Sequence, residues 1–238
     1  MAKEKVVVTG GLGFIGSHLV AALREKDFEV VVADMPEHDI RDTEALAALF
    51  AGAKYVFHLA ALPRVQYSIE HPQETNEVNI GGTVSVLCAA KRAGVERVIY
   101  SASSSAYGDQ DTMPLVESMQ ANPKSPYALQ KYVGELYCRL FAETMGLPTV
   151  CLRYFNVYGP GADPNGAYAL VIAKFLQQRA EGKPLTITGD GTQTRDYTHV
   201  RDVVRANLLA AESSLVGRGE VINIGAGNNA SVNKVAEL

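Results

Sequence analysis

The chain has 238 residues, of which 47% are hydrophobic and 20% are charged. That is enough to bury one sizeable core, so a peptide scaffold and a disordered tail are excluded. The formal net charge of -4 provides no general basic field for a nucleic-acid backbone or an anionic membrane. We therefore expect a small-molecule or protein partner, and neither nucleic acid nor membrane.

The three cysteines are widely spaced and match neither a disulfide framework nor a zinc site, so no metal is expected. The apolar runs fall far short of the roughly 18 residues that a membrane span needs, and the N-terminus has no signal-peptide pattern. These features predict a protein of the reducing cytoplasm.

Short apolar runs alternate with helical patterns along the chain. Strands are expected at 6–8, 30–32, 55–57, 98–100, 150–152 and 221–224. Helices are expected after the first strand through 23, around 45–50, and near 76–93, 126–145 and 201–213. The apolar runs leave no polar face, which is typical of strands covered on both sides. This order predicts an α/β fold of the Rossmann type, with a doubly wound parallel sheet.

Residues 159–195 differ in character from the rest. GPGADPNG has the composition of a loop, a helix is expected from about Tyr168 to Glu181, and ITGDGTQTRD indicates short strands with turns. We interpret this segment as an insertion over the mouth of the sheet.

Three glycines, Gly10, Gly13 and Gly16, lie directly between the first strand and the first helix. In this position Gly10 allows a tight turn, Gly13 lets a phosphate approach the backbone, and Gly16 lets the helix pack close to the strand. The helix N-terminus then faces the pyrophosphate of a dinucleotide. The pattern predicts dinucleotide binding.

Asp34 ends the second strand, 18 residues after Gly16. A carboxylate there accepts hydrogen bonds from the adenosine ribose hydroxyls and repels a ribose phosphate, which favours NAD over NADP. The alternative is an ordinary solvated aspartate at a strand end.

A helix begins at SPYALQK, with Ser125 as the expected N-cap and Pro126 as the first helical residue. Tyr127 and Lys131 then lie four residues apart on one face. The serines of SASSS, residues 101–105, end the strand over 98–100, where an α/β sheet exposes its site.

Nine ordered motifs follow one another along the chain: TGGLGFIGSHLV, HDIRD, HLAAL, NIGGT, SASSSAYGD, SPYALQK, LRYFNVYGP, ITGDGTQTRDYTHVRD and VINIGAG. Together they resemble the NAD-dependent epimerase/dehydratase branch of the extended short-chain dehydrogenase/reductase family, over essentially the whole chain. Within that branch the chain is similar to the UDP-hexose 4-epimerases. The run RYFNVYGPGADPNGAYALVIAKF is similar to enzymes that act on UDP-glucose or its N-acetylated relatives.

The resemblance implies NAD as the cofactor and a UDP-sugar as the substrate. It implies that Tyr127 is the acid/base, that Lys131 holds the nicotinamide ribose, and that Ser103 bonds the reacting hydroxyl. It further implies that Asn156 touches the sugar nucleotide and Arg195 meets its phosphates. Asp39 and Ile40 are implied to line the adenine site. The other implied cofactor contacts are Gly10, Gly13, Phe14, Ile15, Gly16, Asp34, Leu59, Ala60, Ala61, Asn79, Ser101, Tyr127, Lys131 and Tyr154.

The chemistry of these residues fits such roles. A tyrosine titrates near pH 10, so Tyr127 needs the charges of Lys131 and oxidised nicotinamide to favour phenolate near neutral pH. Tyr127 would then take the C4 hydroxyl proton while hydride passes to NAD, and hydride would return to the other face of the 4-keto sugar. Arg195 suits a diphosphate because its planar fork binds phosphate in bidentate fashion, although an internal pair with Asp196 is the alternative.

The resemblance divides the chain into a dinucleotide-binding domain over 1–160, to which 196–226 return, and a partial substrate-binding region over 161–195 and 227–238. Only three residues separate Asp34 from HDI, where the family has a longer loop and another strand, so we expect a missing edge strand and a more open adenine pocket. The chain stops at SVNKVAEL, where the family continues, so the substrate-binding region is expected to be truncated.

Rival functions remain open. A sugar-nucleotide 4,6-dehydratase would need an Asp-Glu pair where this chain has Ser104 and Ser105. Asp34 disfavours an NADP-dependent reductase, and the retained tyrosine and lysine disfavour a noncatalytic NAD-binding protein. Spacing alone does not separate Ser103 from Ser104, and the sequence does not distinguish UDP-glucose and UDP-galactose from their N-acetyl forms.

The helix over 126–145 has two apolar faces. Tyr127, Lys131, Gly134 and Cys138 share the face toward the cofactor, whereas Leu129, Val133, Leu136 and Leu140 share the opposite one. A second apolar stripe needs its own cover, and a twofold axis would let one patch cover both subunits. We therefore expect a homodimer, with burial of the stripe inside the monomer as the alternative.

Overall fold

The computed structural model describes residues 3–164 and 171–238. The strands are β1 (Lys5–Thr9), β2 (Glu29–Ala33), β3 (Ala53–His58), β4 (Arg97–Ser103), β5 (Thr149–Tyr154), β6 (Asn156–Tyr158), β7 (Thr194–His199), β8 (Arg218–Ile224) and β9 (Asn229–Ser231).

The helices alternate with these strands along most of the chain. They are α1 (Phe14–Glu25), α2 (Thr43–Phe50), α3 (Val65–Glu70), α4 (Pro72–Asn76), η1 (Glu77–Gly82), α5 (Thr83–Ala93), η2 (Ser104–Tyr107), α6 (Pro126–Met145), α7 (Val171–Ala180), α8 (Val200–Glu212) and α9 (Val232–Glu237). Within the described ranges, none of them is both long enough and apolar enough to cross a membrane.

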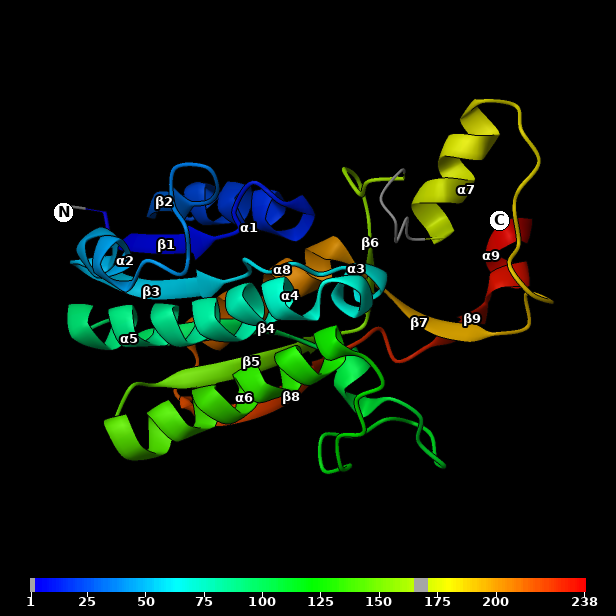
Figure 1. The fold of residues 1–238 in the computed structure, drawn as a ribbon. Helices are drawn as coiled ribbons and strands as arrows, with labels where there is room; N and C mark the ends of the chain where they lie inside the picture. The colour runs from blue at the N-terminus through cyan, green and yellow to red at the C-terminus, as the bar shows by residue number, and fades with distance from the viewer. Residues whose placement is uncertain (1–2, 165–170) are drawn as a thin grey trace.

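Six strands form one parallel sheet in the order β2-β1-β3-β4-β5-β8, which confirms the predicted Rossmann-type fold (Figure 1). The strand order reverses beside β1, because β2 lies on one side of it and β3 on the other. The carboxyl ends of strands at such a switch point open a crevice where α/β proteins bind ligands. The glycine loop after β1 lies there.

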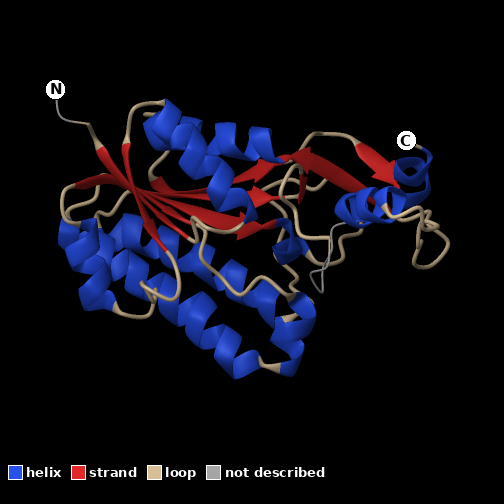
Figure 2. Ribbon diagram, turned by 90° about the horizontal axis from the view of Figure 1, so that it is seen from above, coloured by secondary structure: helices blue, strands red, loops and turns tan. Residues whose placement is uncertain are grey.

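Alternate strand residues build two cores, one on each face of the sheet. Helices α2, α5 and α6 cover one face, around side chains such as Val7, Val56 and Tyr100. Helices α1 and α8 cover the other, around Val8 and Ile99. Figure 2 shows both layers of helices beside the strands. Burial on both faces explains why these runs carry no polar alternation.

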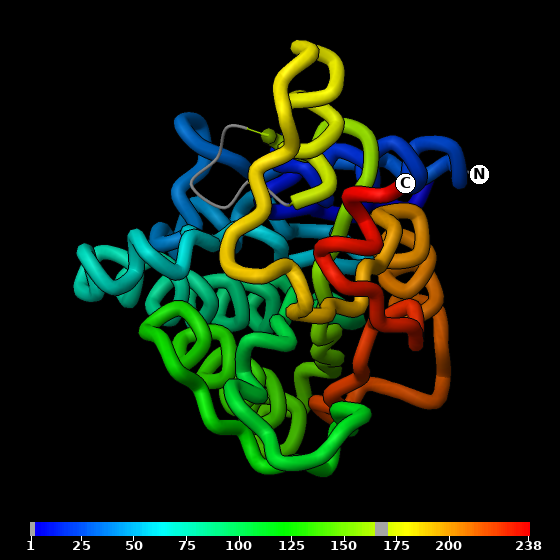
Figure 3. The backbone as a smooth tube through the Cα atoms, turned by 90° about the vertical axis from the view of Figure 1, so that its right-hand side faces the viewer, coloured from blue at the N-terminus to red at the C-terminus, as the bar shows by residue number. Residues whose placement is uncertain are grey.

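A second, three-stranded sheet in the order β6-β7-β9 lies beyond the carboxyl edge of the main sheet, beside α7 and α9 (Figures 1 and 3). The prediction of several short strands in ITGDGTQTRD is wrong, because a strand begins only at Thr194. Gly189 and Gly191 take positive φ angles of 75° and 72°. The Asp190 carboxylate accepts a hydrogen bond from the backbone N–H of Thr192. These features make the segment before Thr194 a turn region.

Two helix predictions need correction. The helix expected near 76–93 begins earlier, at Pro72, and contains the π-helical turn η1 before α5. The helix expected over 168–181 is α7, which ends at Ala180; residues 168–170 lie outside the described residues. Residues 34–42 contain no strand, so β2 forms the edge of the sheet, in line with the missing edge strand predicted from the short loop.

Candidate active site

The glycine loop has the close approaches that its sequence predicts. Gly10 has a φ of +69°, and a Cβ there would lie 2.6 Å from the backbone nitrogen of Ala60. A Cβ on Gly16 would collide with the carbonyl oxygen of Gly10. A side chain at either position would therefore push the loop away from β3 or α1 away from the loop.

Gly13 differs from these two glycines because the space beside it is open. The nearest atom to a Cβ on Gly13 would be the carbonyl oxygen of Gly10 at 3.4 Å, an ordinary contact. Gly13 is also the N-cap of α1, and no side chain caps the helix there. The first amides of α1, from Phe14 and Ile15 onward, thus face a gap that an anion can enter. The loop fits the pyrophosphate of a dinucleotide.

Asp34 lies directly against this loop. One carboxylate oxygen accepts a hydrogen bond of 2.9 Å from the Leu12 N–H, and the other accepts one of 2.9 Å from the Met35 N–H. The side chain is half-buried, and each oxygen retains a lone pair for a further donor. Asp34 therefore lies against the glycine loop with acceptors left for a ligand, and its contact with a ribose diol stays a prediction.

Asp39 and Ile40 each already have a partner within the protein. The Arg41 guanidinium binds Asp39 and holds the pKa of that carboxyl below its usual value. The Ile40 side chain is buried in the core and lies close against Gly82. Contact of these two residues with an adenine ring stays a prediction, as does the more open adenine pocket.

The segment after β3 runs beside the glycine loop. The Leu59 N–H donates to the Thr9 carbonyl at 3.1 Å, and the Ala60 N–H to the Thr9 hydroxyl at 3.3 Å. Asn79 fixes the next residues from η1: its amide accepts from the Leu62 N–H at 2.7 Å and donates to the Leu62 carbonyl at 3.0 Å. Leu59, Ala60 and Ala61 are thus positioned to flank a cofactor. The Asn79 side chain instead holds the backbone of Leu62, the residue that follows them.

Helix α6 begins as the sequence predicts. The Ser125 hydroxyl accepts a hydrogen bond from the Ala128 N–H at 3.2 Å, and Pro126 is the first helical residue. A second serine, Ser68 of α3, accepts from the Tyr127 N–H at 3.0 Å. Ser68 is distant in the sequence, and no local pattern indicated it. Together these contacts fix the first turn of α6, which carries Tyr127.

Tyr127 is half-buried at the carboxyl end of the sheet. Burial raises the pKa of its phenol, and a hydrogen bond with the Ser103 hydroxyl acts in the opposite direction. Ser103 is the last residue of β4 and caps the 3₁₀ turn η2. No side-chain hydrogen bond of Ser104 is found in the described part of the chain. The geometry therefore favours Ser103 over Ser104 as the hydroxyl that works with Tyr127.

Lys131 lies one turn further along α6, and its side chain is buried. Its Nζ donates to the Ser101 carbonyl at 2.8 Å and lies 5.0 Å from the centre of the Tyr100 ring. Burial lowers the pKa of this ammonium to about 8. Gly134 makes the close packing possible, because a Cβ there would collide with the Tyr100 ring.

The floor of the site is built from buried polar groups. The Ser101 hydroxyl and the Tyr154 hydroxyl lie 3.1 Å apart, and Asn207 of α8 donates to the Tyr154 hydroxyl at 2.7 Å. Burial raises the pKa of Tyr154 to about 12, so this phenol is neutral. His58 bonds the hydroxyls of Thr9 and Thr83, and burial lowers its pKa to about 3. His58 therefore carries no charge beside Lys131.

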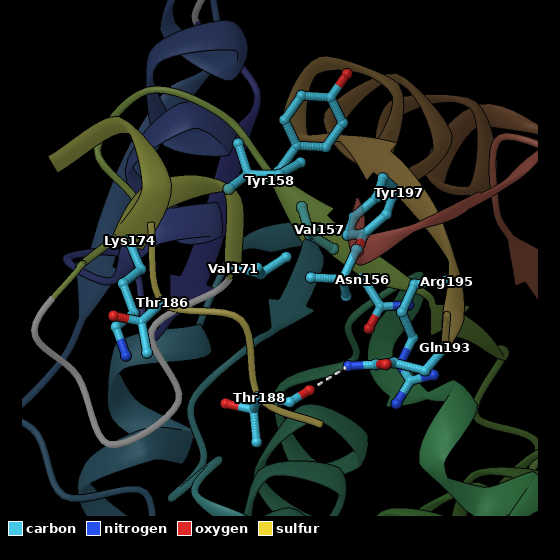
Figure 4. Close-up of a pocket in the computed structure, with 12 residues that line it drawn as sticks. Asn156, Val157, Tyr158, Val171, Lys174, Thr186, Thr188, Gln193, Arg195 and Tyr197 are labelled. Atoms are coloured by element: carbon cyan, nitrogen blue, oxygen red, sulfur yellow. Dashed lines mark hydrogen bonds between the residues drawn. The ribbon is translucent and has the colours of Figure 1, made fainter. Parts of the chain in front are cut away.

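Asn156 and Arg195 line a separate cavity of about 310 Å³ between β6, β7 and α7 (Figure 4). Lys174 of α7 lines it too, a second cation that the sequence pattern did not reveal. Arg195 does not pair with Asp196, whose carboxylate accepts hydrogen bonds of 2.8 Å from Ala226 and Gly227 instead. The cavity thus presents two cations and an amide to an anionic ligand.

Comparisons with known proteins identify the family of this chain. Residues 6–225 match the profile of the NAD dependent epimerase/dehydratase family. The chain belongs to this family. The predicted resemblance is therefore confirmed, and so is the predicted cofactor, NAD, which the glycine loop and Asp34 fit. When bound, NAD supplies the family with a hydride acceptor and donor.

Several epimerases are similar to the chain over nearly its whole length. A putative UDP-glucose 4-epimerase of Methanocaldococcus jannaschii is 36% identical, over 98% of this chain and 80% of that protein. The structure of a UDP-N-acetylglucosamine 4-epimerase from Methanobrevibacter ruminantium M1 aligns with a TM-score of 0.94 at 40% identity, over 100% of this chain and 81% of that one. The structure of a Thermus thermophilus UDP-glucose 4-epimerase in complex with NAD aligns with a TM-score of 0.87 at 34% identity, over 98% and 81%.

Proposed function

We propose that the protein is an NAD-dependent UDP-hexose 4-epimerase that inverts C4 through a transient 4-keto sugar. The observations that carry this proposal are the hydrogen bond between Ser103 and Tyr127 and the buried Lys131, bound to the Ser101 carbonyl one turn further along α6, in a chain of an NAD-dependent family. The names of similar proteins support it, since they include epimerases of UDP-glucose and of UDP-N-acetylglucosamine.

In this proposal Tyr127 is the acid/base. Its phenolate would take the proton of the C4 hydroxyl, and the phenol would later return it. NAD, when bound, would supply the acceptor and donor of the C4 hydride. Burial alone raises the pKa of Tyr127, so the phenolate needs the ammonium of Lys131 and the hydroxyl of Ser103 nearby. Lys131 also binds the nicotinamide ribose, and the remaining cofactor contacts are those assigned from the resemblance.

The cavity beside β7 is the proposed site of the sugar-nucleotide diphosphate. Arg195 and Lys174 supply positive charge, and Asn156 supplies an amide whose nitrogen donates to the Asp196 carbonyl at 3.0 Å. The substrates are UDP-glucose and UDP-galactose or their N-acetyl forms. We retain the division into a dinucleotide-binding domain and a substrate-binding region. We also retain a cytoplasmic location, which the three free cysteines support.

A 4,6-dehydratase is the rival within the family. Elimination of water needs a carboxylic acid beside the catalytic hydroxyl, and η2 carries Ser104 and Ser105 there. Hydroxyls at these positions favour the epimerase. An NADP-dependent reductase is disfavoured by the position of Asp34, and a noncatalytic protein by the tyrosine and lysine held at the site.

We also propose a homodimer through α6. Leu129, Leu136 and Leu140 are 49%, 43% and 46% exposed, a stripe of apolar side chains on the face opposite Lys131. Light scattering at micromolar concentration is expected to give a dimer, and Leu136→Asp a folded monomer. A monomeric wild type would contradict the proposal.

Proton NMR of sugar-nucleotide turnover tests the function. Purified protein with its bound NAD is incubated separately with UDP-glucose and UDP-N-acetylglucosamine. The proposal predicts the C4 epimer of one or both, with no free NADH formed. A 4-keto-6-deoxy product would identify a dehydratase instead, and the absence of conversion of either would favour a noncatalytic protein.

A further inference from the structure

The Ser103 hydroxyl receives two hydrogen bonds from a single neighbour, Ser105. The Ser105 N–H donates to the Ser103 oxygen at 3.2 Å, and the Ser105 hydroxyl donates to the same oxygen at 2.8 Å. A serine oxygen has two lone pairs and one hydrogen. Residue 105 therefore fills both lone pairs of Ser103, and only the hydrogen of Ser103 remains for a third partner.

The third partner is the side chain of Tyr127, which Ser103 meets from the end of β4. Since Ser103 has no lone pair left, it donates in this contact and does not accept. A donor stabilises the phenolate of a tyrosine relative to the phenol. The direction of this hydrogen bond thus depends on Ser105, a residue that acts through Ser103.

We propose that Ser105 is a positioning residue whose hydroxyl fixes Ser103 as a hydrogen-bond donor to the Tyr127 phenolate. The consequence for turnover rests on the proposed function; the hydrogen bond from Ser103 to Tyr127 does not. In the epimerisation the proton of the C4 hydroxyl moves directly to the Tyr127 phenolate. Ser103 keeps its own hydrogen throughout, because it has no free lone pair to receive another.

The other groups that face Tyr127 are held by partners of their own. On α6, Lys131 is tied to the Ser101 carbonyl, and Glu135 binds Arg153 of β5. On β4, burial raises the pKa of Tyr100 well above its usual value; on β3, His58 is neutral. From α3, Ser68 contacts the backbone of Tyr127. None of these contacts involves Ser105, so its substitution changes the Ser103 contact alone.

Removal of the Ser105 hydroxyl has a defined consequence. In Ser105→Ala the backbone N–H still fills one lone pair of Ser103, but the other becomes free. Ser103 can then turn and accept from the Tyr127 phenol, which stabilises the protonated form. Ser105→Thr keeps the hydroxyl and is the rescue variant. Ser104→Ala removes a hydroxyl from the same turn and is the matched control.

The test is an ultraviolet titration of tyrosinate in the NAD-loaded protein. Each variant is titrated with and without the additional substitution Tyr127→Phe, and the difference between the two curves is the signal of Tyr127. Ser105→Ala is expected to raise the midpoint by about one pH unit, whereas Ser105→Thr and Ser104→Ala leave it in place. Ser105→Cys, whose thiol is a weak donor, is expected to give a smaller rise and replaces the alanine variant if that variant does not fold.

With a UDP-sugar that is turned over, Ser105→Ala should lower kcat about tenfold, leave KM unchanged and move the acid limb of the pH profile upward by the same amount as the titration. An unchanged midpoint in folded Ser105→Ala and Ser105→Cys would overturn the proposal. A shifted midpoint in a protein that turns over no UDP-sugar would support the positioning role and reject the proposed function.

Discussion

The two ends of the proposed site are built in opposite ways. At the carboxyl end of β4, Lys131 and Ser103 have made their hydrogen bonds within the protein, to the Ser101 carbonyl and with Ser105. At the cavity beside β7, exposed Arg195 donates to the carbonyl of its neighbour Thr194, and the buried Tyr197 hydroxyl has no partner within the described residues. The proposed reacting groups are thus oriented by the protein itself, whereas Arg195 and Tyr197 retain donors for a ligand.

The helices at the two ends, α6 with Lys131 and α7 with Lys174, are also anchored differently. Helix α6 lies on the sheet and holds a buried ion pair, with the Arg153 Nε donating to the Glu135 carboxylate at 2.8 Å. Helix α7 buries Phe175 alone among its described residues. Reacting groups on a well-anchored helix need little reorganisation during the reaction. Lys174, on the lightly anchored α7, can adapt to a substrate, whereas Arg195 and Tyr197 lie on β7.

Breaking the anchor of α6 is expected to have the largest effect. Glu135→Leu leaves the Arg153 guanidinium buried without its carboxylate, so the free energy of unfolding should fall by about 4 kcal/mol in urea denaturation. The double variant Glu135→Leu with Arg153→Met removes both charges and should recover most of this loss. Equal stability of the single variant and the wild type would show that the pair does not anchor α6.

Lys131→Met should make the cofactor-free protein more stable while removing its activity. The pKa of the buried ammonium is lowered from 10.5 to about 8, which reduces the free energy of unfolding of the wild type by about 3 kcal/mol at pH 7. The variant removes this penalty but also loses the hydrogen bond to Ser101, which is worth about 1 kcal/mol. We therefore expect a gain of about 2 kcal/mol in denaturant unfolding.

The pH dependence of that gain has a definite sign. Between pH 8 and pH 10.5 folded wild type binds fewer protons than the unfolded chain, so its stability rises with pH in this window. The advantage of Lys131→Met should accordingly shrink across the window and be gone above it. A variant that is less stable than wild type at pH 7 would contradict the assignment.

At the binding end, Arg195→Ala should raise KM for the UDP-sugar about tenfold and leave kcat nearly unchanged, because a charge-assisted contact to phosphate is lost without any change near Tyr127. Arg201→Ala, on the exposed first turn of α8, removes a cation outside the cavity and serves as the control. Equal increases in KM for both variants would indicate a general charge effect and not a phosphate site.

Asp34→Ala should have the smallest effect, a relaxed preference for NAD over NADP by about tenfold in relative affinity, since the carboxylate that repels a ribose phosphate is gone. Calorimetric titration with both dinucleotides measures it. Glu37→Ala removes an exposed carboxylate from the same loop and should leave the preference intact. Equal binding of both cofactors by the wild type would show that Asp34 does not select NAD.

Local signals made much of the fold predictable. The helix predicted near 126–145 matches α6, because Ser125 and Pro126 mark its start, and Gly146 ends it in the left-handed conformation. The central strands followed from apolar runs. The three-residue strands β6 and β9 are too short to show a period, and the positive-φ turns before β7 imitate strand composition.

The candidate site was predictable where its residues lie within one motif. Tyr127 and Lys131 are one helical turn apart, and the glycine loop is continuous. Lys174 and Ser68 reach the site from elements that a single sequence does not place beside it. The hydrogen bonds from Ser105 to Ser103 depend on the turn of η2, which the serine-rich pattern does not specify.

Turnover by Tyr127→Phe tests the central claim most directly, because the variant keeps the ring and removes the group that moves the proton. The measurement is the rate of C4 epimerisation by proton NMR, together with the NAD content of the same preparation, and Tyr132→Phe on the same helix is the control. The proposed mechanism predicts a rate lower by roughly 100-fold or more with NAD still bound, and an unchanged rate for the control. Wild-type turnover by Tyr127→Phe would contradict it.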